Sequence, residues 1–141
     1  VGLVVLVADQ VSKWWAIDSL GGGRTLELIW TLQLRLVRNT GVAFSKGQGS
    51  GPIIALVVVC VVLLLFRIGA KVGQPVARIA VGAVIGGAVG NLSDRVFRSE
   101  EGLLRGAVVD FVDFQWWPVF NVADAAIVLG GVVIVWSGLA R

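Results

Sequence analysis

Four long apolar stretches dominate the sequence, and they cover about 1–17, 52–69, 76–92 and 119–139. Each is close to the length of about 20 residues that a helix needs to cross a bilayer. The pattern predicts a single integral membrane domain over 1–141, mainly α-helical, with four transmembrane helices. Because the first stretch is short for a span, we expect further residues before Val1. In the third stretch glycines recur at 82, 86 and 90, which predicts a face against which another helix packs closely.

The connections between these stretches carry their own pattern. Over 28–36 apolar residues alternate with polar ones, and this period of two is typical of a half-buried β-strand. Residues 39–41 (Asn-Thr-Gly) indicate a turn, 42–45 a returning strand, and 106–114 a further strand. We therefore expect a small extracytoplasmic β-sheet, built from about 26–46 and 106–114, that lies on the outer membrane surface.

The composition supports a membrane protein and limits its chemistry. Hydrophobic residues make up 57% of the chain, charged residues 15%, and the mean hydropathy is +0.89. An ordinary soluble domain carries about 25% charged residues. The chain has no histidine, which excludes a Ser-His-Asp triad, a Cys-His dyad and a His-ligated metal site, and its single Cys60 excludes an intrachain disulfide. The net charge of +3 suits contact with anionic lipid and gives no indication of nucleic-acid binding.

The positions of lysine and arginine predict the orientation in the membrane. Arg67, Lys71 and Arg78 lie around the short connection between the second and third stretches, which contains no acid. Such a loop is typical of the cytoplasmic side. Both termini then face the cytoplasm and the two long connections lie outside, although the first of these also contains several basic residues.

A few charged residues lie where charge is costly and usually functional. Asp124 lies inside the fourth stretch, three residues after Asn121, and Asp110 lies in an apolar run shortly before it. The segment ending at 116–118 (Trp-Trp-Pro) allows the chain to fold back and bring the two carboxylates together. Such a pair shares one proton, so that one carboxylate activates a water while the other donates to the substrate carbonyl. Asp113 competes with Asp110 for this role.

The same residues also have structural interpretations. Asp9 with Lys13 fits an ion pair, Asp94 with Arg95 fits a salt bridge at a helix end, and Asp124 fits a buried acid bonded to a neighbouring helix. Carboxylates at several depths in the membrane would indicate a protein that conducts protons or ions. A non-catalytic membrane assembly factor is a third hypothesis for the function. The second and third stretches carry no acid in mid-span, which favours a protease with its acids at one outer level.

Five short motifs extend along nearly the whole chain. They are 9–13 (DQVSK), 39–45 (NTGVAFS), 86–95 (GGAVGNLSDR), 108–111 (VVDF) and 120–124 (FNVAD). In this order they resemble the signature of lipoprotein signal peptidase, the type II signal peptidase of bacteria.

The resemblance implies an aspartic endopeptidase with four transmembrane helices, a small sheet and an amphipathic arm. It implies cleavage of prolipoproteins just before a diacylglyceryl-modified cysteine, with Asp110 and Asp124 as the catalytic pair and with no metal or cofactor. It further implies inhibition by globomycin-type cyclic peptides, and a location in the bacterial inner membrane with the active site near the outer leaflet. The residues that it implies for support of the site and of the substrate are Asn39, Asn91, Arg95, Asn121, Asp9 and Lys13.

Overall fold

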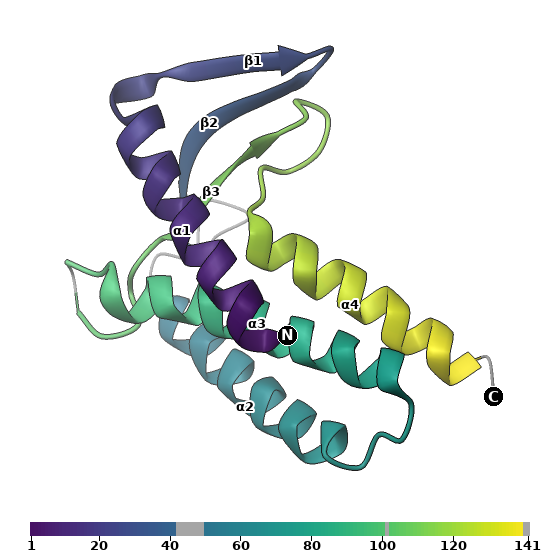
Figure 1. Cartoon of the computed structure of the whole chain (residues 1–141). Helices are drawn as coiled ribbons and strands as arrows, with labels where there is room; N and C mark the ends of the chain where they lie inside the picture. Colours follow the sequence, from purple (N-terminus) through teal and green to yellow (C-terminus); the bar gives the residue numbers. More distant parts are fainter. Residues whose placement is uncertain (42–49, 101, 140–141) are drawn as a thin grey trace.

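The computed structural model describes residues 1–41, 50–100 and 102–139, and it places a small sheet at one end of a group of helices (Figure 1). The helices are α1 (Gly2–Leu20), the short 3-10 helix η1 (Gly21–Gly23), α2 (Gly51–Gly69), α3 (Pro75–Phe97) and α4 (Val122–Leu139). The strands are β1 (Thr25–Ile29), β2 (Leu32–Asn39) and β3 (Val108–Asp113). The protein is therefore mainly helical with a minor β component. Among the described residues no helix lies outside this set, so the expected amphipathic arm is not assigned to a segment.

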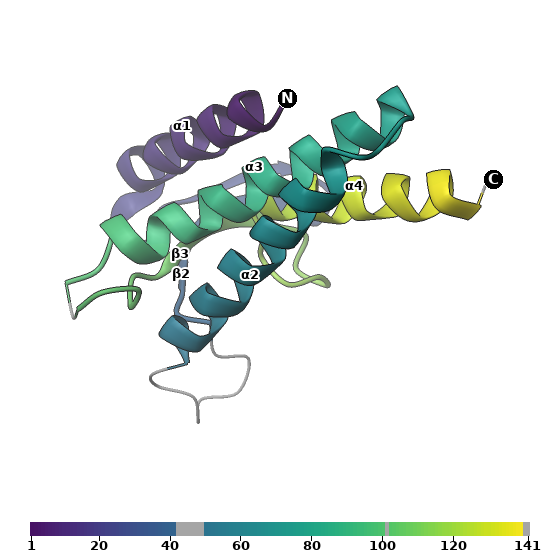
Figure 2. The same cartoon turned by 90° about the horizontal axis from the view of Figure 1, so that it is seen from below.

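Helix α3 is the central element, and α1, α2 and α4 all pack against it (Figure 2). Glycine makes two of these contacts possible, because a Cβ on Gly86 would lie 2.3 Å from the carbonyl oxygen of Gly2 in α1. A Cβ on Gly87 would lie 2.6 Å from the carbonyl oxygen of Ala123 in α4. The expectation that the glycine spacing serves close helix packing is confirmed.

The outer surfaces of the helices are apolar. On α2, Ile53, Leu56 and Leu63 are all exposed, as are Val128 and Val132 on α4. Helices α2 and α3 are long and apolar enough to cross a membrane, and α4 is a shorter apolar helix over Val122–Gly138. Exposure of such large apolar surfaces to water is unfavourable, so these surfaces suit a hydrocarbon environment.

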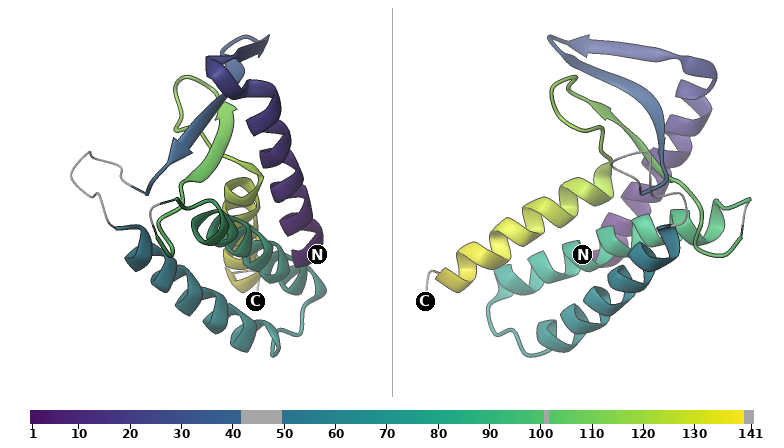
Figure 3. Two further views of the ribbon diagram at one scale, coloured as in Figure 1. Left: turned by 90° about the vertical axis from the view of Figure 1, so that its left-hand side faces the viewer. Right: turned by 180° about the vertical axis from the view of Figure 1, so that it is seen from behind.

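The sheet is antiparallel, in the order β1-β2-β3, and it lies beyond the ends of α1 and α4 (Figure 3). The prediction of one continuous strand over 28–36 is wrong, because a two-residue turn at Trp30 and Thr31 divides it into β1 and β2. Trp30 adopts φ 52°, the left-handed conformation that such hairpin turns require. The predicted returning strand at 42–45 lies outside the described residues.

Strands β2 and β3 cover a small apolar core beneath the sheet. Phe111 of β3 packs there with Ala16 and Leu20 of α1. Between Leu34 and Val37 the register of β2 against β3 shifts by one residue, which marks a β-bulge. The sheet is thereby anchored on the end of α1 and holds β3 in a fixed position.

Three helix boundaries differ by three residues or more from those predicted. Helix α1 continues past residue 17 to Leu20, and α3 continues past residue 92 to Phe97. Helix α4 begins at Val122 rather than at 119, because Phe120 instead forms an antiparallel bridge with Val112 of β3. Residues 119–121 thus connect the sheet to α4.

Candidate active site

The first turn of α4 is closed by two side chains that cap each other. Asn121 Oδ1 accepts a hydrogen bond from the Asp124 backbone N–H at 2.9 Å, and Asp124 Oδ2 accepts one from the Asn121 N–H at 3.3 Å. This reciprocal pattern is a capping box, and it satisfies amides that the helix itself leaves unpaired. Asp124 is thus held at the start of α4, where the helix dipole favours negative charge. The spacing of Asn121 and Asp124 before an apolar run is the sequence signal for this cap.

Asp110 lies in β3 and is only 2% exposed. Its Oδ1 accepts a hydrogen bond from Asn121 Nδ2 at 2.7 Å, and its Oδ2 accepts one from Asn39 Nδ2 at 3.2 Å. Burial, and after it the nearby charge of Asp124, raise the pKa of Asp110 to about 6, although the hydrogen bonds from the two asparagines act in the opposite direction. Asp110 therefore holds a proton far more readily than an ordinary aspartate.

Asn91 of α3 connects the two halves of this arrangement. Its Nδ2 donates to Asp124 Oδ1 at 2.8 Å, and its Oδ1 accepts from Asn121 Nδ2 at 3.1 Å. Asn121 thus bonds to Asp110, and Asn91 bonds to Asp124, while the two amides also contact each other. The fold brings Asp110 of β3 and Asp124 of α4 into one hydrogen-bonded cluster, to which β2 and α3 contribute an asparagine each.

Behind this cluster lies a buried group of charges on α1 and α3. Lys13 Nζ lies 2.8 Å from Asp9 and 2.9 Å from Asp94, and all three side chains are inaccessible to solvent. The expected pair of Asp9 with Lys13 is confirmed. The expected pair of Asp94 with Arg95 is wrong, because neighbouring residues on a helix point to different faces, and Asp94 bonds instead to Lys13 and to Arg98 at 3.0 Å.

Two partners in this buried group were not singled out from the sequence. Gln10 Nε2 donates to Asp94 Oδ1 at 3.1 Å and to the Gly90 carbonyl oxygen at 3.1 Å. Arg98 is the second cation on Asp94. Gln10 belongs to the DQVSK motif and Arg98 lies one helical turn after Asp94, so both positions carried a usable signal.

Arg95 lies on α3 and is 8% exposed. Its Nη1 has no hydrogen-bond partner among the described residues. A Cβ on Gly41 would lie 3.2 Å from that nitrogen, so the chain just after β2 approaches the guanidinium closely. A buried donor of this kind is able to bind a carbonyl or carboxylate oxygen of a ligand.

Asp113 does not join the cluster. Its Oδ2 accepts hydrogen bonds from Arg35 Nε at 2.5 Å and Gln33 Nε2 at 2.8 Å, both on β2. Residues three apart on a strand point to opposite faces, which separates Asp113 from Asp110. The hydrogen bond from Arg35, followed by that from Gln33, lowers the pKa of Asp113 to about 2.

Two cavities open beside the two carboxylates. The cavity beside Asp110 has a volume of about 510 Å³ and is lined in part by Arg38, Asn39 and Gly41. The cavity beside Asp124 has a volume of about 270 Å³ and is lined almost entirely by apolar groups, which are Trp117, Phe120, Ala125, Val128 and Leu129. The cavity beside Asp110 therefore offers polar groups together with apolar ones, whereas the cavity beside Asp124 is almost entirely apolar.

Asp9, Asp94, Asp110 and Asp124 lie in one connected network where α1, α3, β3 and the start of α4 meet. Such a grouping is expected for a protease rather than for a relay, whose acids would be spread along the bundle. No group of three potential metal ligands occurs among residues 1–41, 50–100 and 102–139. Asp110 is buried and has a raised pKa, Asp124 is partly buried, and each accepts a hydrogen bond from a side-chain amide. Such a pair can activate a water and protonate a carbonyl. The fold and the site together have the form of an aspartic peptidase whose helices suit a membrane.

Comparisons with known proteins agree with this class. A sequence model described as signal peptidase (SPase) II matches residues 1–140. The chain is 47% identical over 133 residues to a lipoprotein signal peptidase of Rhodococcus jostii (strain RHA1), covering 94% of this chain and 67% of that protein. It is 43% identical over 136 residues to a lipoprotein signal peptidase of Mycobacterium tuberculosis (strain ATCC 25618 / H37Rv), covering 96% and 67%. The chain belongs to the signal peptidase II family.

Solved structures agree as well. A bacterial membrane enzyme determined by the in meso method at 2.3 Å resolution superposes with a TM-score of 0.84 at 27% identity, covering 99% of this chain and 85% of that one. A second such enzyme at 1.9 Å resolution also gives a TM-score of 0.84, covering 98% and 89%. The fold is therefore that of a bacterial membrane enzyme.

Proposed function

We propose that Asp110 and Asp124 form the catalytic pair with which this chain, an aspartic endopeptidase, removes signal peptides from prolipoproteins. The observation that carries the proposal is the position of Asn121, which donates to Asp110 at 2.7 Å and forms a capping box with Asp124. One asparagine thus ties both carboxylates into a single arrangement. The proposal assigns the site, whereas the activity itself follows from the family.

The reaction divides into two steps. In the first, Asp124 takes a proton from a water whose oxygen attacks the scissile carbonyl carbon, and Asp110 gives its proton to the carbonyl oxygen. In the second, the C–N bond breaks, Asp124 returns its proton to the leaving nitrogen, and Asp110 recovers a proton from the hydroxyl as the carboxyl product forms. The raised pKa of Asp110 supports its role as the initial proton donor.

The two cavities suggest how a lipid-modified substrate lies. The cavity beside Asp110, which Asn39 helps to line, suits the peptide backbone. Asn39 and the Nη1 of Arg95 would bind that backbone, while Asn91 orients Asp124. The apolar cavity beside Asp124 suits the residue that carries the lipid. Cleavage just before a diacylglyceryl-modified cysteine fits this division, because the acyl chains would remain in hydrocarbon.

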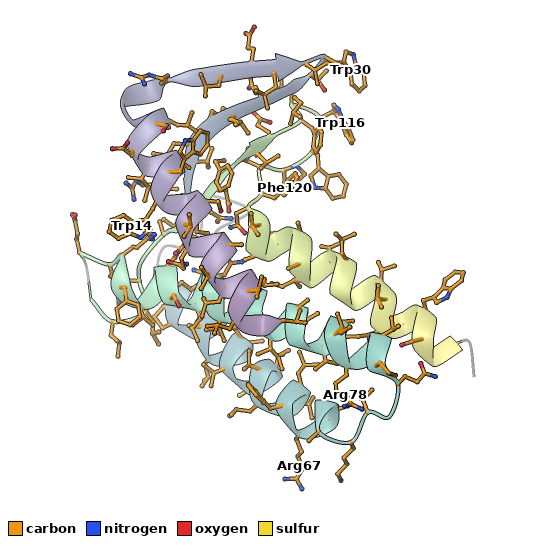
Figure 4. All side chains as sticks on the ribbon, viewed as in Figure 1. Trp14, Trp30, Arg67, Arg78, Trp116 and Phe120 are labelled. Atoms are coloured by element: carbon orange, nitrogen blue, oxygen red, sulfur yellow. The ribbon has the colours of Figure 1, made fainter. Side chains whose placement is uncertain are left out.

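The same proposal includes a topology of four membrane-spanning helices in a single domain. Trp30, Trp116 and Phe120 lie at the sheet end of the molecule, whereas Arg67 and Arg78 lie at the opposite end (Figure 4). Aromatic residues favour the membrane interface, and basic residues favour the cytoplasmic side. The sheet is then extracytoplasmic, both termini are cytoplasmic, and the carboxylates lie near the outer leaflet.

Cleavage of a diacylglyceryl-modified prolipoprotein peptide by purified enzyme in detergent tests the assignment. We expect the wild type to cleave and Asp110→Asn and Asp124→Asn to be inactive while they remain folded. Asp113→Asn is the matched control, since it removes the same carboxylate only three residues from Asp110. An active Asp110→Asn with an inactive Asp113→Asn would refute the proposed pair.

A globomycin-type cyclic peptide gives a second test. We expect it to inhibit the wild type in competition with the prolipoprotein peptide. Inhibition that does not weaken as substrate is raised would argue against binding at the two carboxylates.

A further inference from the structure

The buried charges on α1 and α3 are bonded to the backbone immediately before each catalytic residue. Asp94 Oδ2 accepts a hydrogen bond from the N–H of Val109, the residue before Asp110, at 3.0 Å. Asp9 Oδ1 accepts one from the N–H of Ala123, the residue before Asp124, at 3.0 Å. Each carboxylate of the buried group thus holds the peptide unit that leads into one member of the catalytic pair.

Lys13 connects Asp9 with Asp94, and it also contacts Asn91, which is bonded to Asp124. Its Nζ lies 2.8 Å from Asp9, 2.9 Å from Asp94 and 2.9 Å from Asn91 Oδ1. An ammonium group has three protons and no acceptor, so these three partners use its full capacity. Because Lys13 only donates, it fixes which end of the Asn91 amide faces it, and the Nδ2 end is left to donate to Asp124 at 2.8 Å.

The packing of α1 on α3 leaves room for the buried charged group. A Cβ on Gly90 would lie 2.5 Å from Asp9 Oδ2, so only glycine at that position allows the carboxylate to reach α3. Arg98 supplies a second positive charge at 3.0 Å from Asp94, which leaves two acids and two bases in the group. Burying such charges is costly, and apolar residues of similar volume would often be no less stable. Stability of the helix contact alone therefore does not account for the group.

We infer that Asp9, Lys13 and Asp94 act as one positioning unit that sets the separation of the two catalytic carboxylates and the orientation of the Asn91 amide. This inference rests on the proposed catalytic pair. Lys13 is a positioning residue in this scheme, because it acts through Asn91 and through the Asp9 and Asp94 anchors.

The pH dependence of the reaction shows whether Lys13 acts on the catalytic pair or only stabilises the packing of α1 on α3. Asp110 is faced by Asp124 from α4, Lys13 from α1 and Arg95 from α3, and Arg38 of β2 lines the same cavity. The positive charge of Lys13 lowers the pKa of Asp110. Its removal should therefore move the alkaline limb of the rate profile, where Asp110 loses its proton, to higher pH.

The test uses the full chain with the double substitution Asp9→Asn/Lys13→Met. The double substitution removes one acid and one base together, so that no single charge is left unpaired. The asparagine at position 9 keeps an oxygen that can accept the hydrogen bond from the Ala123 N–H. The control is Asp113→Asn/Arg35→Met, which removes the same two kinds of charge from a pair in the sheet. For each variant, far-UV circular dichroism and thermal unfolding report the fold, and kcat, KM and the pH profile report the site.

We expect the double variant to remain folded and to lose about 100-fold in kcat with KM nearly unchanged, because a displacement of about 1 Å at a reacting group costs about that much. The alkaline limb of the pH–rate profile should move to higher pH. The kcat of the control should stay within about twofold of the wild-type value. A folded double variant with wild-type kcat, a loss confined to KM, or a failure to fold would each overturn the positioning role. Failure of the proposed pair itself is separate, since it appears as an active Asp110→Asn or Asp124→Asn enzyme.

Discussion

The contact between α3 and α4 makes the position of Asp124 sensitive to a single methyl group. Gly87 of α3 lies against the carbonyl of Ala123, the residue before Asp124. In Gly87→Ala the new Cβ would lie 2.6 Å from that carbonyl oxygen and 3.0 Å from Ile127 Cγ1. The first of these neighbours is backbone at the start of α4, so it cannot move aside as a flexible side chain does.

The magnitude of the effect follows from these distances. Ordinary contact begins at 3.4 Å, so the start of α4 must shift by about 0.8 Å. A misplacement of about 1 Å can reduce a rate about 100-fold, and we therefore expect kcat to fall by about 10- to 100-fold. Overpacking costs about 1–3 kcal/mol, while alanine gains about 1 kcal/mol over glycine in a helix, so the net loss of stability is about 0–2 kcal/mol.

The assay is prolipoprotein cleavage together with thermal unfolding in the same detergent. Gly131→Ala in α4 is the matched control, because a Cβ there meets nothing within 4 Å. It should keep the wild-type kcat and gain up to about 1 kcal/mol from helix propensity. A Gly87→Ala enzyme with the kcat of Gly131→Ala would refute the reasoning, since it would mean that the position of α4 does not limit the chemistry.

Three further predictions concern the polar network. In the proposed mechanism Asp110 acts protonated, and its pKa is about 6, so kcat/KM should fall above that pH. Asn39→Ala should move this fall to higher pH, because the hydrogen bond that it removes favours the charged form of Asp110. Asn121→Ala should remove the cap of α4 at a cost of about 1 kcal/mol and should lower kcat, as measured by thermal unfolding and cleavage. Asp113, with its pKa lowered from 3.8 to about 2 by Arg35, stabilises the fold above pH 3.8, and this stability is lost as the pH falls towards 2. In Asp113→Asn the unfolding temperature should therefore vary less over that range, and an unchanged slope would count against the pair.

Two features of the fold could not be predicted from local sequence. The hairpin between β1 and β2 turns at Trp30 and Thr31, although glycine or asparagine usually occupies the two positions of such a turn. Helix α4 starts three residues later than predicted, because pairing of Phe120 with Val112 competes with the helix. Both errors arise where tertiary contacts override local preference.

The apolar segments, the mainly helical class with a small sheet, and the unusual acids could all be identified from the sequence. Charge inside an apolar run is costly, so Asp110 and Asp124 stood out without any structure. Their motifs, in order along the chain, also identified the family.

Which charged residues contact one another depends on the tertiary structure. Asp113 is three residues from Asp110, yet the strand turns it to the opposite face, where Arg35 of β2 binds it. Lys13 is adjacent in sequence to neither Asn91 nor Asp94, yet it contacts both, because glycines on α3 admit α1 to close range. Hydrogen bonds and ion pairs act over a few ångströms in space, and the distance between two residues along the chain does not set that separation.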